Sequence, residues 1–323
     1  MISFINLSLF LFCVGIYSTC SIILKKVDKK SLFVLWTLPI MYIFVYIGFF
    51  SMSFYQGQTF YTIVKSLYHF SGENIPFYLL RSADLILANI MLFYILNNFP
   101  ISQAALVFQI AIPISSLYYF ALGEPITLTT ILGIFLVTIG AVTAGLKKLE
   151  YNILKPLATI PPKLYLVGTL RAFFQVTGTI LIFIVSTKTW ETKSIHTALN
   201  FRDLGYTHFD TVLHYAMGGI PFIVIPYLLY FFIVERVSYT EMKLYGKNNF
   251  RLILLNSFLE ALTFLLYIIV FQSVQNKLLL TIIEKCKIPF TLFLASTFLK
   301  EKVGPPQIVA TVLIIAGGLL SLL

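Results

Sequence analysis

Three charged residues lie close together inside an apolar stretch near the C-terminus: Glu284, Lys285 and Lys287. A charge that faces lipid at the centre of a bilayer is costly, so these side chains are expected to face protein or water. On a helix Glu284 and Lys287 share one face, whereas Lys285 points about 100° away from Glu284. One lysine can therefore pair with the glutamate while the other stays available to an anionic group of a ligand.

Four further ionisable residues lie within apolar stretches: Arg81, Asp84, Arg171 and Glu260. Arg81 and Asp84 are three positions apart, so on a helix they could neutralise each other. Arg171 lies about two turns from the end of its stretch, near enough for its side chain to reach the membrane interface. Glu260 could join the charges at residues 284–287 in an internal salt-bridge network, an alternative that the sequence leaves open.

The composition of the chain indicates the environment of these charges. Of its 323 residues, 59% are apolar and only 11% are charged, with a mean hydropathy of +0.90. A soluble domain averages about 25% charged residues. The longest polar stretches are too short to form a core of their own. These features predict a polytopic membrane protein and exclude a soluble enzyme or a nucleic-acid-binding protein, so the net charge of +10 belongs to the loops.

Ten apolar segments are long enough to position these residues in a membrane. They cover residues 4–24, 31–54, 76–96, 101–122, 126–146, 164–187, 211–234, 251–271, 278–299 and 304–323. Each is expected to be a helix, because a backbone in lipid must satisfy its hydrogen bonds internally and no segment alternates as a barrel strand does. Between the second and third segments, apolar residues at helical spacing over residues 60–68 predict a short interfacial helix.

The distribution of basic residues predicts the orientation of the chain. Lysines and arginines are far more numerous in the odd-numbered loops than in the even-numbered loops. The positive-inside rule then places the odd-numbered loops in the cytoplasm and both termini outside.

The two halves of the chain are similar to each other at an offset of 177 residues. The offset superposes residues of related type, namely Glu124 on Glu301, Gly140 on Gly317 and Gly133 on Ala310. Small residues seven positions apart lie on one helical face and allow helices to approach closely in lipid. A proline precedes the glutamate in each half, Pro113 and Pro289, and is expected to kink its helix. Five helices per half, an odd number, require the halves to be inserted in opposite orientations.

Two stretches of the chain resemble the end of each half of a drug/metabolite transporter superfamily protein. They are residues 97–142, NNFPISQAALVFQIAIPISSLYYFALGEPITLTTILGIFLVTIGAV, and the similar residues 278–320. The similarity is to the EamA-like ten-helix type. It implies an all-α integral membrane protein of ten transmembrane helices, built as two inverted five-helix repeats over residues 1–150 and 151–323. The repeats would surround a central cavity and work by alternating access. In this family both termini usually face the cytoplasm, opposite to what the basic residues predict.

The resemblance also implies which residues line the cavity, because the family draws its cavity from the third, fourth, eighth and ninth helices. Here those helices carry Arg81, Gln103, Gln109, Glu260, Glu284 and Lys285, and Asp84 and Lys287 complete the predicted substrate-binding set. The sugar-phosphate and nucleotide-sugar branches hold phosphate with a basic dipeptide in the ninth helix. This chain has Lys285-Cys286-Lys287 instead, which departs from that pattern.

The expected function is a secondary active transporter of a small charged or zwitterionic metabolite, either an amino acid or a nucleotide-like compound. Glu260 or Glu284 could carry a proton and couple transport to a proton gradient. A first alternative is a sugar-phosphate or nucleotide-sugar exchanger that uses Lys285 and Lys287. A second is a non-transporting membrane scaffold or a lipid-handling protein.

Catalytic spacing of His, Asp or Ser at a membrane face is not found, so an enzyme is not expected. The histidines and cysteines match no metal motif, and we expect neither a metal nor a cofactor. The expected partners are the small-molecule substrate and membrane lipids, with no nucleic acid, in a monomer or homodimer. A composition rich in phenylalanine and lysine and poor in alanine is compatible with an AT-rich genome, such as that of an intracellular bacterium or a parasite. The expected location is the cytoplasmic (inner) membrane of a bacterium.

Overall fold

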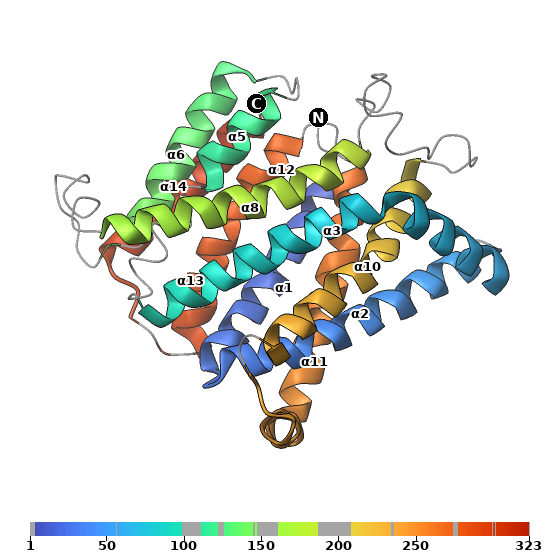
Figure 1. The fold of residues 1–323 in the computed structure, drawn as a ribbon. Coiled ribbons are helices and arrows are strands. Elements are labelled where there is room, and N and C mark those ends of the chain that lie inside the picture. Colours follow the sequence, from blue (N-terminus) through green and yellow to red (C-terminus); the bar gives the residue numbers. More distant parts are fainter. Residues whose placement is uncertain are drawn as a thin grey trace. The chain divides into compact units, whose positions relative to one another are not determined.

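The computed structural model describes residues 4–55, 57–98, 111–121, 126–144, 146, 161–186, 208–233, 236–273, 277–298, 300 and 302–322. Within these residues the chain is helical and contains no strand (Figure 1). The helices are α1 (Phe4–Lys26), α2 (Lys30–Tyr55), α3 (Phe60–Asn98), α5 (Ala111–Ala121), α6 (Leu128–Ala144), α8 (Pro162–Ser186), α10 (His208–Ile233), α11 (Tyr239–Ser273), α12 (Lys277–Ile283), α13 (Lys287–Phe298) and α14 (Pro305–Leu322). A short 3-10 segment, Glu284–Cys286, joins α12 to α13.

Four of these helices are long and apolar enough to cross a membrane. The apolar stretches are Ile5–Leu24, Leu32–Tyr55, Tyr239–Val270 and Pro305–Leu322. Helices suit such stretches because each backbone N–H and C=O group finds its partner within the segment. Every described helix overlaps one of the apolar segments predicted from the sequence. How many of them cross a membrane stays a prediction.

Two helices are longer than the apolar pattern predicts. Helix α3 runs without interruption from Phe60 to Asn98, so the expected interfacial helix forms its first turns. Helix α11 begins at Tyr239, twelve residues before the predicted start. Its polar first turns are held by a hydrogen bond of 2.9 Å from Trp36 Nε1 to Met242 O, and by an ion pair between Lys29 and Glu241 with an N···O distance of 2.5 Å. Hydropathy misses such turns because polar contacts, and not lipid, stabilise them.

The chain forms two compact units, each assembled from separate segments of the sequence. Unit 1 comprises Met1–Ile22, Leu87–Val176 and Ser273–Leu323, and unit 2 comprises Ile23–Ile86 and Thr177–Gln272. Both units therefore take segments from each half of the chain. The division into repeats at residue 150 concerns symmetry within the sequence and stays a prediction.

The closest helix packing of unit 1 is between α6 and α14. A Cβ atom added at Gly133 would lie 2.6 Å from Gly317 O, and one added at Gly140 would lie 3.0 Å from Ala310 O. Gln307, at the start of α14, donates hydrogen bonds to Ala144 O and Leu146 O, at 3.3 and 3.0 Å, at the end of α6. The two helices are thus antiparallel, and small residues at the predicted spacing let their backbones approach.

Adjacent glycines of α14 offer a matched test of this packing. We expect Gly317→Ala to lower the melting temperature of the detergent-purified protein, because its added Cβ would lie 2.7 Å from Gly133 O. The cost of such overpacking is about 1–3 kcal/mol. Gly318→Ala is the control, because its Cβ would meet only Cys286 Sγ at 3.9 Å. Equal melting temperatures for the two variants would contradict the observed packing.

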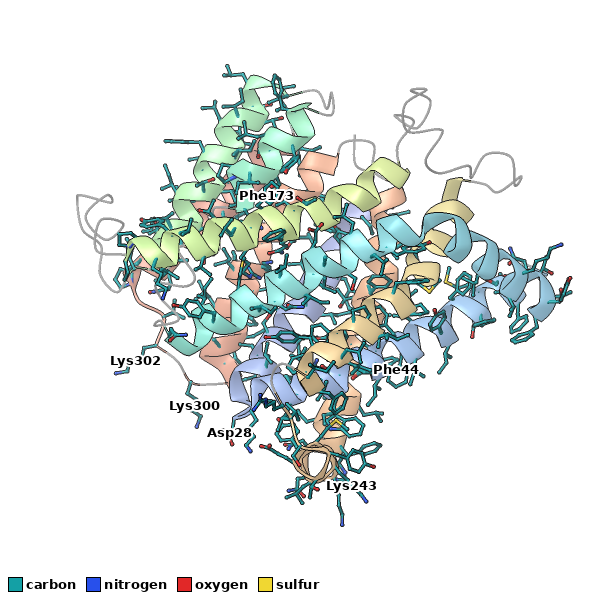
Figure 2. All side chains as sticks on the ribbon, viewed as in Figure 1. Asp28, Phe44, Phe173, Lys243, Lys300 and Lys302 are labelled. Atoms are coloured by element: carbon teal, nitrogen blue, oxygen red, sulfur yellow. The ribbon has the colours of Figure 1, made fainter. Side chains whose placement is uncertain are left out.

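Unit 2 is built around α2, α10, α11 and the first part of α3. Its buried core contains Met41, Tyr42, Val45, Phe49, Ile63, Tyr78, Met217, Ile220, Ala261 and Ile268. The Tyr46 hydroxyl donates to Met217 O at 2.9 Å, which links α2 to α10. Beyond this core, Asp28 and Lys243 are exposed charged residues (Figure 2).

Candidate functional site

The charged cluster of the ninth apolar segment coincides with a break in the helix. Helix α12 ends at Ile283, the 3-10 segment covers Glu284–Cys286, and α13 begins at Lys287. Pro289 explains the position of the break, because proline has no N–H to donate to the carbonyl four residues earlier, which is that of Lys285. Backbone N–H groups at the end of the 3-10 segment donate to Glu284 O and Lys285 O instead. Short 3-10 stretches within a longer helix often mark functional hinges.

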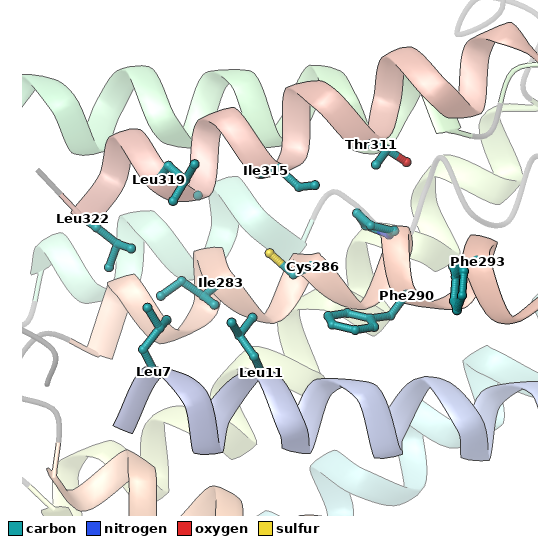
Figure 3. A pocket seen from close by; sticks show the side chains of 12 residues that line it. Leu7, Leu11, Ile283, Cys286, Phe290, Phe293, Thr311, Ile315, Leu319 and Leu322 are labelled. Atoms are coloured by element: carbon teal, nitrogen blue, oxygen red, sulfur yellow. The ribbon is translucent and has the colours of Figure 1, made fainter. Parts of the chain in front are cut away.

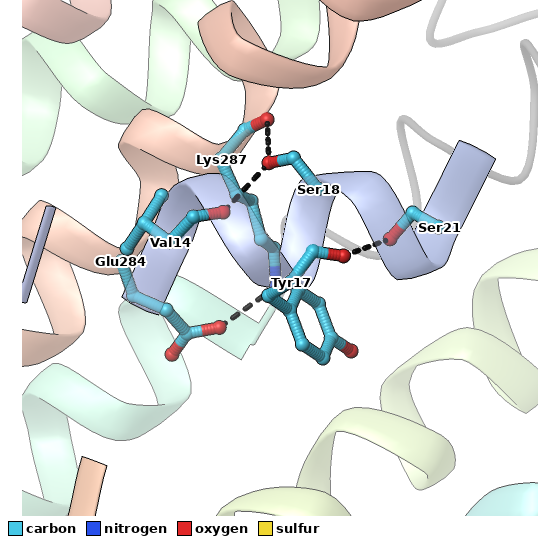
Figure 4. A network of polar contacts seen from close by, with 6 residues as sticks. All are labelled: Val14, Tyr17, Ser18, Ser21, Glu284 and Lys287. Atoms are coloured by element: carbon cyan, nitrogen blue, oxygen red, sulfur yellow. Dashed lines mark hydrogen bonds and ion pairs between the residues drawn. The ribbon is translucent and has the colours of Figure 1, made fainter. Parts of the chain in front are cut away.

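Glu284 and Lys287 form the ion pair that their spacing predicts. Lys287 Nζ lies 2.7 Å from Glu284 Oε1, and the two side chains are 26% and 32% exposed. Lys287 Nζ also lies 5.2 Å from the ring centroid of Tyr17 on α1, within range of a cation–π interaction. The fully buried Ser18 Oγ lies 2.8 Å from Val14 O and 3.2 Å from Lys287 O (Figure 4). Helix α1 therefore contacts the start of α13 through Tyr17 and Ser18.

Lys285 has a different environment from Lys287. Its side chain is only 6% exposed. Glu284 attracts its ammonium group electrostatically, but among the described residues the ion pair within 4 Å joins Glu284 to Lys287 instead. Arg171 of α8 is close enough to interact electrostatically with both lysines. Among its described residues, unit 1 thus gathers three cations around one carboxylate, an arrangement with an excess of positive charge that favours an anionic ligand.

The other predicted charged residues belong to unit 2. Glu260 lies on α11, one turn after the buried Asn256, and Tyr227 of α10 is close enough to interact with it electrostatically. Asp84 is buried on α3. Several buried polar atoms of this unit have no hydrogen-bond partner in the described structure, namely Asp84 Oδ2, Ser82 Oγ, Tyr227 Oη and Asn256 Oδ1. Unit 2 therefore contains a second buried polar group of residues, although its role in binding stays a prediction.

Several predicted residues lie outside what the structure describes. They are Gln103, Gln109, Glu124 and Glu301, together with the side chain of Arg81. The expected pairing of Arg81 with Asp84 therefore stays a prediction. Among the described residues no three His, Cys, Asp or Glu side chains come together as a metal site would need.

Sequence reasoning did not connect Tyr17, Ser18 or Arg171 to the site. Tyr17 and Ser18 stand in an apolar segment that carries no charge, and nothing in their spacing indicates a partner 270 residues away. Arg171, which the sequence places within reach of the membrane interface, lies near two lysines. Of the features of this site, the sequence signalled the change of helix type at Glu284–Cys286, because Pro289 predicts a kink there.

Comparison with known proteins bears on the fold and not on the substrate. No family model matches the chain, and no curated protein matches it. Fourteen chains of solved structures match it. One of them, described only as "Crystal structure of protein", has a TM-score of 0.61 and 12% sequence identity, covering 98% of this chain and 96% of that one. At this identity the likeness shows a shared fold along nearly the whole chain.

Proposed function

We propose that the chain is a ten-helix secondary transporter of the drug/metabolite transporter type, which moves a small charged or zwitterionic metabolite by alternating access. The observation that carries the proposal is the buried Lys285, which makes no ion pair within 4 Å among the described residues and lies near the Glu284–Lys287 pair and Arg171. A carboxylate or phosphate group would satisfy Lys285. Glu284 offers an oxygen to an ammonium group, so an amino acid fits both signs of charge.

The packing of α6 on α14 supports the inverted repeat that this proposal requires. The offset of 177 residues relates Gly133 to Ala310 and Gly140 to Gly317. The contact of Gly133 with Gly317 therefore corresponds, in the other half, to the contact of Ala310 with Gly140. Both contacts occur, and the helices are antiparallel. This is the pattern expected when a pseudo-two-fold axis in the membrane plane relates two oppositely inserted repeats.

The helix break supports alternating access. Discontinuous helices near the membrane midplane are typical of transporter binding sites, because their free backbone groups and charged side chains face a cavity. The 3-10 turn Glu284–Cys286 is a local change of helix type next to the charges, in which the Glu284 and Lys285 carbonyls remain hydrogen-bonded. A change in the angle between α12 and α13 would move Lys285 relative to its surroundings, which is how a bound substrate could bias the transporter towards one side.

Arg171 favours a second candidate, an exchanger of sugar phosphates or nucleotide sugars. Three cations in one cluster can neutralise a phosphate, which carries more charge than a carboxylate. The candidates differ in the ligand that fills the site, so one experiment separates them.

We expect a ligand screen by thermal shift to identify the substrate class. The purified protein is tested with amino acids, nucleotides, nucleotide sugars, sugar phosphates and organic cations. A ligand that binds the folded state raises the melting temperature by mass action. Stabilisation by amino acids or nucleotides supports the first candidate, and stabilisation by sugar phosphates or nucleotide sugars alone supports the second. Stabilisation by organic cations alone, or by nothing in the panel, contradicts the proposal and favours a scaffold or a lipid-handling protein.

A further inference from the structure

An apolar groove with a volume of about 450 Å³ lies within unit 1, between α1, α14 and the α12–α13 segment (Figure 3). Leu7 and Leu11 line it from α1. The walls opposite contain Ile283, Cys286 and Phe290 on one side and Ile315, Gly318 and Leu319 on the other. The groove therefore shares the segment of Lys285 and Lys287, but a different face of it, because in a 3-10 segment Cys286 points about 120° away from Glu284.

The lining offers almost nothing to a polar ligand. Only Thr311 and Cys286 carry a heteroatom in their side chains. The Thr311 hydroxyl donates to Gln307 O of its own helix at 2.9 Å, so its hydrogen is already used. A polar ligand would lose its hydrogen bonds to water here without replacement, which is costly. The occupant must therefore be apolar along its whole buried length.

The dimensions of the groove match half of a bilayer. Its lining runs from Thr311 to Leu322 on α14 and from Ile283 to Phe293 on the opposite segment. At a rise of 1.5 Å per residue each wall is about 15 Å long, which is half of the hydrocarbon thickness of about 30 Å. Helices α1 and α14 both contain stretches apolar and long enough to cross a membrane. Phe293 and Leu319 are 66% and 60% exposed, so the groove is open along its side.

We propose that this groove is a binding site for one acyl chain of a membrane lipid. The chain would lie along α14 and pack against Cys286, on the side of the 3-10 segment that faces away from the Glu284–Lys287 pair. An acyl chain bound in the groove would then pack against the apolar face of the 3-10 segment and stabilise it. The inference depends on the apolar walls formed by α1 and α14 and not on the identity of any transported substrate, so it can hold even if the proposed function fails.

Gly318 provides the means to test the site. A Cβ atom at this position would have Cys286 Sγ at 3.9 Å as its nearest neighbour among the described residues, and Gly318 lines the groove, so a larger side chain here occupies groove space. Gly318→Leu is therefore expected to fill part of the groove. The control is Ile131→Phe, which adds bulk at an exposed position of α6 outside the lining.

The experiment uses the purified full chain in detergent with phosphatidylcholine that carries a photoactivatable diazirine in one palmitoyl chain. After irradiation, adducts are located by peptide mass spectrometry. We expect adducts to be several-fold enriched in α13 and α14 peptides over α6 peptides. Gly318→Leu should lower this enrichment several-fold, whereas Ile131→Phe should preserve it.

A competition on the wild-type protein decides the matter if Gly318→Leu does not fold. Excess unlabelled phosphatidylcholine with palmitoyl chains should remove the α13 and α14 adducts, whereas phosphatidylcholine with short chains should leave them. Adducts spread evenly over all exposed apolar helices, or insensitive to both Gly318→Leu and the competitor, would overturn the proposal. Failure of the ligand screen would not affect either readout.

Discussion

Lys285→Met is expected to weaken the stabilisation of the protein by its substrate while leaving the unliganded protein as stable as the wild type, or more so. Methionine has a similar length and removes only the charge. A hydrogen bond to a charged group contributes about 1.5–3 kcal/mol, which corresponds to substrate affinity weaker by about 10- to 100-fold. In the unliganded protein the buried ammonium has no ion-pair partner among the described residues, so its removal relieves a desolvation cost.

These opposite effects separate a binding lysine from a structural one. If Lys285 only stabilised the fold, Lys285→Met would lower the melting temperature of the protein and would not specifically alter its ligand affinity. The measurements are the melting temperature without ligand and the ligand dependence of the shift, followed by uptake into proteoliposomes. Lys243→Met is the control, because Lys243 is an exposed residue of α11. Unchanged ligand affinity and uptake in Lys285→Met would remove Lys285 from the site.

Glu284→Gln is expected to lower the stability of the protein, and a second substitution is expected to restore it. Loss of the carboxylate leaves Lys287 with a positive charge that, among the described residues, has the Tyr17 ring and nearby cations around it. Breaking a fully buried pair costs about 3–5 kcal/mol. With 26% and 32% of the two side chains exposed, we expect on the order of 2 kcal/mol.

The double variant Glu284→Gln/Lys287→Met tests the origin of this loss. It removes both charges, so no uncompensated ammonium remains and most of the lost melting temperature should return. The coupling between the two sites is measured by a double-mutant cycle of melting curves. Additive losses in the double variant would show that the pair does not interact as its 2.7 Å separation indicates. Transport need not recover, because Glu284 is also a candidate ligand for a substrate ammonium group.

The two proposed sites lie on one short segment and can be examined separately. Lys285, Glu284 and Lys287 carry the charges, whereas Cys286 lines the apolar groove. Substitutions at Gly318 change the groove and leave every charged residue in place. Transport assays on Gly318→Leu would therefore report whether a lipid chain influences the polar site through the helix break.

The sequence by itself determined the environment and the secondary structure of the protein. Low charge and long apolar segments require helices in a membrane, because only internal hydrogen bonding satisfies a backbone in lipid. The same local information identified faces of α6 and α14 that allow close packing, because small residues seven positions apart lie on one helical face, whereas the structure showed that these two faces meet each other. The pairing of Glu284 with Lys287 also follows from local geometry, because residues three apart on a helix are neighbours.

Only the tertiary structure decided which distant residues surround this pair. Tyr17 and Ser18 contact Lys287 from the first helix, and Arg171 approaches both lysines from α8. Glu260 and Asp84, which are charged residues of the same kind, fall in unit 2 instead. The physical reason is that hydropathy and periodicity act along one segment, whereas the choice of neighbouring helices depends on how all the segments pack together.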